Sequence, residues 1–150
     1  MTINEFNEIL DFAIDREREA VAFYKELQEQ TKFASQRELL KELEAMEMGH
    51  IVVIENIRKK GVSEENIQKT PNLKISEYFT RELDSAELTY QSILIKAMKR
   101  EENSFRLYSE MSVKFSDEDL STLFRKLAAD EAKHKLYFEK QYDDFICKGN

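Results

Sequence analysis

The chain has 150 residues with a formal net charge of −7, a length that predicts one domain with a sizeable core. Its only cysteine is Cys147, so intramolecular disulfides and paired-cysteine zinc or electron-transfer modules are excluded. The acidic net charge without an evident basic stripe argues against a nucleic-acid-binding protein. No apolar run is long enough to span a membrane, and the N-terminus does not have the pattern of a secretory signal, so we expect a soluble, cytoplasmic protein.

The first predicted helix follows an apolar stripe from Ile3 to Leu27, in steps of three and four residues. Thr2 and Glu5 form a capping-box pattern at its start. Only three glycines and one proline occur in the whole chain, and this composition favours helix nearly throughout.

A second stripe from Leu40 to Ile57 predicts the next helix. Ser35 and Glu38 predict a capping box at its start, and the segment 59–61, Lys-Lys-Gly, predicts its end. The segment from Gly61 to about Ser76 contains the only proline, and we predict that it connects two helical hairpins.

Two further stripes, Tyr90–Met111 and Leu120–Phe145, predict the second hairpin. Residues 77–88 form either a short helix or an early start of its first helix. Four long amphipathic helices predict an all-α four-helix bundle. We expect a single domain, 1–150, built from hairpins at about 2–60 and 77–148.

Six ionisable residues interrupt the apolar stripes at positions that face the predicted core. These are Glu17, Glu47, His50, Glu101, Glu131 and His134. Burying four carboxylates without compensation would cost more free energy than a typical domain's stability, and no Lys or Arg lies on the stripes. Two divalent metal ions would balance the four carboxylates beside two neutral imidazoles, so we predict a two-metal site.

All candidate ligands are related by one sequence offset. Glu17 and Glu101, Glu47 and Glu131, and His50 and His134 are each 84 positions apart. The flanking sequence repeats at the same offset, which indicates a duplicated helical hairpin. The midpoints between the two glutamates of each half, residues 32 and 116, fall in the predicted turns, so the glutamates stand at the same height on antiparallel helices.

The pattern resembles the ferritin-like di-iron carboxylate family, and within it the rubrerythrin-like branch. It combines one glutamate from each of two helices with Glu-x-x-His from each of the other two. Tyr24 and Tyr108, seven residues after Glu17 and Glu101, add to the likeness. The chain lacks the paired-cysteine rubredoxin domain, and it has Ser104 where such proteins have a further glutamate.

This resemblance implies a ferritin-like bundle with a long crossover between helices two and three, and a homodimer. It implies that Glu47 and Glu131 bridge two metals, and that the other four residues are terminal ligands. Iron is the expected metal, with manganese or zinc as alternatives. For Tyr24 and Tyr108 we expect hydroxyls that bond to ligand carboxylates, with a redox role as the alternative.

The expected activity is reduction of hydrogen peroxide, or O2, with electrons from a separate donor protein. One alternative is a ferroxidase that handles iron, and another is a metal-stabilised binding module without turnover. A single buried histidine is usually an ordinary core residue, and a single glutamate usually faces solvent. The matched positions of both histidines and all four glutamates favour metal ligands instead.

Overall fold

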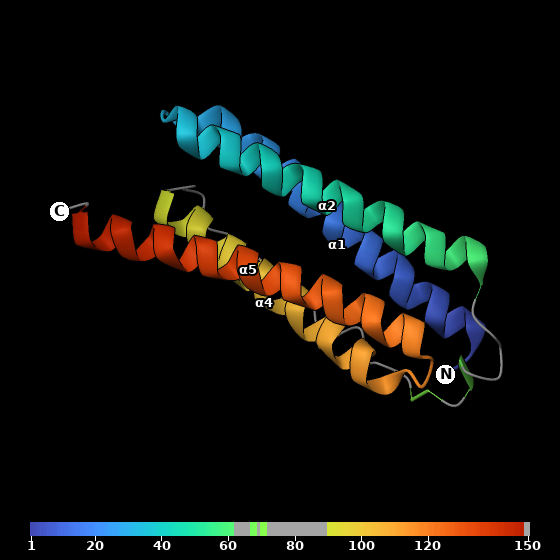
Figure 1. Ribbon diagram of the computed structural model, residues 1–150. Coiled ribbons are helices and arrows are strands. Elements are labelled where there is room, and N and C mark those ends of the chain that lie inside the picture. Colours follow the sequence, from blue (N-terminus) through green and yellow to red (C-terminus); the bar gives the residue numbers. More distant parts are fainter. Residues whose placement is uncertain (62–66, 69, 72–89, 149–150) are drawn as a thin grey trace. The chain divides into compact units, whose positions relative to one another are not determined.

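The computed structural model describes residues 1–61, 67–68, 70–71 and 90–148. Its four long helices are α1 (Ile3–Gln30), α2 (Ala34–Lys60), α4 (Tyr90–Lys114) and α5 (Glu118–Lys148). The chain divides into two compact units, Met1–Leu73 and Lys74–Asn150. In the first unit α1 lies beside α2, and in the second α4 lies beside α5 (Figure 1). A single domain over 1–150 stays a prediction.

The start of α1 is the predicted capping box. The Glu5 amide donates to Thr2 Oγ1 at 3.1 Å, and the Thr2 amide donates to Glu5 Oε2 at 3.0 Å. These two bonds satisfy amides that have no partner within the helix. The stripe of α1 is buried as predicted at most positions, including Leu10 and Tyr24, whereas Ile3 at its edge is exposed.

The predicted capping box at the start of α2 is wrong. The helix begins at Ala34, its N-cap is Phe33, and no side chain caps it. Ser35 therefore lies inside the first turn, where the helical backbone does not allow the N-cap geometry. The predicted end is confirmed: Gly61 takes φ 67°, and its amide donates to the Ile57 carbonyl at 3.1 Å.

Part of the predicted connection packs against the start of the chain. The Met1 ammonium group donates to the carbonyl oxygens of Ile67, at 3.2 Å, and Thr70. Ile67 and Thr70 are both buried. The predictions for residues 77–88 lie outside the described residues. No helix in the described ranges has the length and apolar character needed to cross a membrane.

The second unit repeats the layout of the first. The turn between α1 and α2 spans 31–33, and the turn between α4 and α5 spans 115–117, which is the same segment shifted by 84 positions. The Leu120 amide donates to Asp117 Oδ1 at 3.1 Å and caps α5. Phe124 stacks on Phe115 and Tyr108, with ring centroids 5.8 and 6.2 Å away, and closes the core near this turn.

The exposed face of α5 has a cationic middle, and exposed acidic residues, Glu118, Asp119, Asp143 and Asp144, lie on either side of it. Its exposed residues between the capped first turn and Lys140 are Thr122, Arg125, Lys126, Ala129, Lys133, Leu136 and Lys140. Four of these seven are cationic and none is acidic. The buried residues of the same helix, which include Leu127 and Phe138, face the opposite way.

Candidate metal centre

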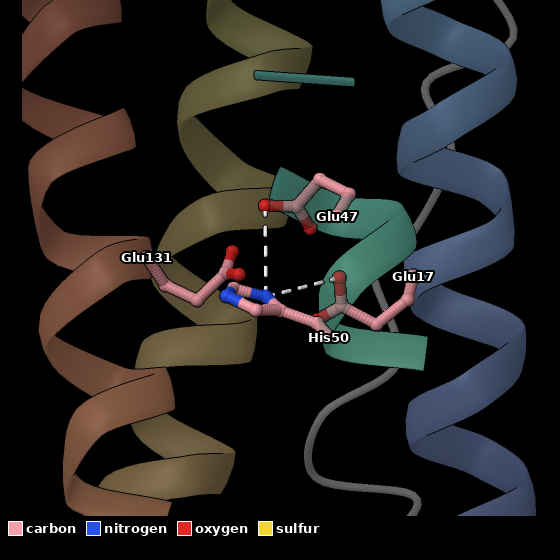
Figure 2. A group of neighbouring side chains, drawn as sticks. All are labelled: Glu17, Glu47, His50 and Glu131. Atoms are coloured by element: carbon pink, nitrogen blue, oxygen red, sulfur yellow. Dashed lines mark ion pairs between the residues drawn. The ribbon is translucent and has the colours of Figure 1, made fainter. Parts of the chain in front are cut away.

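The first unit brings three of the predicted ligands together. Glu17 on α1 faces Glu47 and His50 on α2 (Figure 2). His50 Nδ1 lies 3.4 Å from Glu17 Oε2 and 3.8 Å from Glu47 Oε1. Each of the three residues offers a ligand atom, and these atoms all lie within 4.8 Å of one another. The spacing of three residues places Glu47 and His50 on adjacent turns of one helix face.

The second unit holds the equivalent group. Glu101 on α4 faces His134 on α5, and His134 Nδ1 lies 3.4 Å from Glu101 Oε2. Glu101, Glu131 and His134 also offer one ligand atom each within 4.8 Å of one another. Each hairpin therefore carries the same half-site, with two carboxylates and one imidazole.

Both half-sites are buried. The four glutamates are 1–2% exposed, and His50 and His134 are 5% and 2% exposed. No lysine or arginine in the described ranges is buried, so neither residue type supplies the positive charge that these carboxylates need there. Two carboxylates and one imidazole in each group form a donor set that suits iron, manganese or zinc. The chemistry of the residues therefore fits the predicted metal ions.

Tyr24, Tyr108 and Ser104 lie on the same helices as Glu17 and Glu101. Tyr24 and Tyr108 are 1% and 0% exposed, and each lies about two turns after the glutamate of its own helix. Ser104, where the resemblance led us to look for a further glutamate, is half-buried on α4. Within the described part of the chain, no His, Cys, Asp or Glu outside the six predicted ligands joins them. The roles of individual ligands stay predictions.

Comparison with known proteins decides the family. The model of the rubrerythrin family matches residues 8–142. The chain belongs to the rubrerythrin family. A solved structure of a hypothetical protein from Pyrococcus furiosus is also similar, with a TM-score of 0.71 and 25% identity over 93% of this chain and 89% of that one. No curated protein matches.

Membership of the rubrerythrin family confirms two predictions from the sequence. The predicted resemblance is correct, and the fold class is the all-α ferritin-like bundle. A rubrerythrin-family chain with two buried Glu-Glu-His groups is a ferritin-like protein with side chains able to hold metal.

Proposed function

We propose that this chain is a di-iron oxidoreductase that reduces hydrogen peroxide, or O2, with electrons from a separate donor protein. The observation that carries the proposal is the presence of one buried Glu-Glu-His group in each hairpin of a rubrerythrin-family chain. In the ferritin-like bundle, two such groups together make the six-ligand set of di-iron carboxylate proteins.

Each ligand has a proposed role. Glu47 and Glu131 would bridge the two ions, and Glu17, Glu101, His50 and His134 would each hold one ion. Four carboxylates neutralise the charge of two divalent ions, and burial keeps bulk water from competing for them. Two adjacent ferrous ions supply one electron each, which is what two-electron reduction of peroxide requires.

The overall reaction requires an external reductant. Hydrogen peroxide takes up two electrons and two protons, its O–O bond breaks, and two water molecules form. Cys147, the only cysteine, is exposed and has no second thiol with which to form a redox pair. Two one-electron donations from a carrier protein would therefore restore the ferrous state, and solvent would supply the protons.

Anaerobic loading with Fe(II), followed by one equivalent of hydrogen peroxide in a stopped-flow spectrometer, tests this proposal. We expect ferrous oxidation that is much faster in the wild type than in Glu47→Ala. Glu55→Ala is the matched control, because Glu55 lies on the same helix with a side chain 42% exposed. Equal rates in the wild type and Glu47→Ala would overturn the proposal.

Repeating the Fe(II) loading under O2, with iron content measured per chain, separates the alternatives. A ferroxidase that stores iron would accumulate many more ions per chain under O2 than two. A metal-stabilised binding module would hold iron that stays ferrous in the presence of O2 or hydrogen peroxide.

A further inference from the structure

Between Arg125 and Lys140 the outer face of α5 is a cationic stripe on an acidic protein, and the next exposed residues along the helix are Asp143 and Asp144. Arg125, Lys126, Lys133 and Lys140 are exposed, and no acidic residue lies among the exposed residues of this stretch. No ion pair ties Lys126, Lys133 or Lys140 to another residue of the described ranges, and Arg125 donates only a long bond, 3.4 Å, to Ser121 Oγ. These four cations are available to a partner.

The acidic residues of the same segment do not neutralise the stripe. Asp130 and Glu139 are partly buried on the flanks of the helix. Glu139 pairs with Lys135 at 3.6 Å, and Lys135 also pairs with Glu102 on α4 at 2.6 Å. Glu139 is thus engaged within the second unit.

The duplicated hairpin provides an internal comparison. At the equivalent positions, 84 residues earlier, α2 has Lys41, Glu42, Gly49 and Asn56, which together carry no net charge. The same kind of helix therefore forms without these cations, and folding of the hairpin does not account for them. At these equivalent positions α2 has charges of both signs, which is usual for a solvated helix face.

The stripe lies directly behind the second half-site. Glu131 and His134 occupy the buried face of α5, and Lys133 lies between them in sequence but on the outer face. A helix is about 10–12 Å across with its side chains, so one helix separates this surface from two predicted ligands. The positions 125 to 140 span roughly 22 Å at about 1.5 Å per residue, and their middle coincides with the ligand pair.

We infer that the outer face of α5 is the docking surface for an acidic one-electron carrier protein that delivers electrons to the metal centre. This inference rests on the proposed function, which needs such a donor. Each encounter oxidises one carrier and passes one electron through α5, so two encounters supply the two electrons for one peroxide. The stripe's length suits the small, transient interfaces of electron-transfer complexes.

Charge complementarity also decides which partner to expect. An acidic carrier meets four cations here, and charge attraction accelerates encounter without requiring tight binding. Single-stranded nucleic acid is less well matched, because the exposed residues of the stripe include no aromatic side chain on which bases could stack. The apolar residues among them are only Ala129 and Leu136.

The test compares two variants with the same net charge. In the stripe variant Arg125, Lys126, Lys133 and Lys140 are all replaced by Gln. In the control variant four exposed lysines of the first unit, Lys25, Lys41, Lys59 and Lys60, are replaced by Gln. The probe is a reduced acidic [2Fe–2S] ferredoxin, and reduced methyl viologen serves as a donor that needs no docking surface.

We measure peroxide-dependent oxidation of both donors by the iron-loaded full chain, and ferredoxin binding by fluorescence anisotropy at low and high salt. For the stripe variant we expect the ferredoxin kcat/KM and the affinity at low salt to fall by about tenfold or more, with the viologen rate unchanged. For the control variant we expect changes of less than about twofold.

Three results would overturn the inference. The first is an equal loss of ferredoxin kcat/KM and affinity in both variants. The second is tighter binding of a duplex DNA oligonucleotide than of ferredoxin to the stripe. The third is a wild-type protein that turns over viologen but neither binds nor oxidises ferredoxin. If wild-type protein binds ferredoxin through the stripe but viologen supports no turnover, the proposed function fails while the docking surface stands.

Discussion

Glu17 Oε2 lies 3.4 Å from His50 Nδ1 across the first hairpin, and Glu101 Oε2 lies 3.4 Å from His134 Nδ1 across the second. The two contacts are equivalent, because each ligand of the first hairpin lies 84 positions before its counterpart in the second. A duplicated hairpin has thus kept the same half-site in both copies. The two half-sites should contribute equally to metal binding, because each offers the same donor atoms at the same burial.

Glu47→Gln should have opposite effects on stability with and without metal. Without metal, the substitution removes one of the buried like charges, so the melting temperature should rise by roughly 2–4 °C for each 1 kcal/mol gained. With Fe(II) present, the variant should be less stable than the wild type, because weaker binding stabilises the folded state less.

Calorimetry with and without a chelator measures both effects. Glu55→Gln is the control, because this exposed glutamate pairs with Arg18 at 3.6 Å and its loss should change little. A Glu47→Gln variant that is equally destabilised in both conditions would show that Glu47 is an ordinary structural residue.

Tyr24→Phe and Tyr108→Phe should each weaken metal binding about 10-fold to 100-fold, the usual cost of losing a group that orients a ligand. Both rings are fully buried, so the aromatic packing survives and only the hydroxyl is lost. Competitive titration of Fe(II) against a chelator measures the affinity. Tyr142→Phe is the control, since its hydroxyl accepts a bond from Gln91 Nε2 at 3.2 Å. Unchanged affinity in both variants would exclude the predicted role of the hydroxyls.

Thr2→Ala should lower the free energy of unfolding by about 1 kcal/mol, because it removes the side-chain half of the capping box. Ser35→Ala should change it far less, since Ser35 lies inside α2 and does not cap it. Urea unfolding monitored by circular dichroism compares the two. A larger loss for Ser35→Ala than for Thr2→Ala would contradict the helix starts described above.

Tyr137 should make the folded state sensitive to alkaline pH. Burial, followed by repulsion from Tyr90, raises the pKa of Tyr137 to about 12 from the usual 10.0. The folded state therefore favours the neutral phenol. The resulting contribution to the stability of the folded state is fully present below pH 10 and is lost as the pH rises to 12. Between pH 9 and 11, wild-type stability in urea should fall more steeply than that of Tyr137→Phe. Parallel curves would contradict this assignment.

Much of the fold was predictable because the sequence repeats the pattern of a helical hairpin. The offset of 84 positions places both turns, and the observed turns at 31–33 and 115–117 obey it. The interrupted apolar stripes identified six buried polar residues, because Glu17 or His134 on an otherwise apolar helix face has no ordinary structural reason to be there.

Other features were not predictable from local sequence. Ser35 and Glu38 have the spacing of a capping box, but the chain enters α2 earlier, and the spacing alone does not determine where a helix starts. The cationic stripe of α5 is not evident from the sequence, because its cations alternate along the chain with acids such as Asp130 and Glu139 on other faces. Only the burial pattern of the helix shows which charged residues lie on its exposed face and which lie on its flanks.

Iron content per chain after anaerobic loading with Fe(II) and removal of loosely bound metal tests the central claim most directly. We expect about two ions per wild-type chain, and an equal loss of iron in His50→Ala and His134→Ala, because the two half-sites are equivalent. A wild-type chain that retains no iron, or retains it undiminished in both variants, would contradict the claim that these buried side chains form a two-metal site.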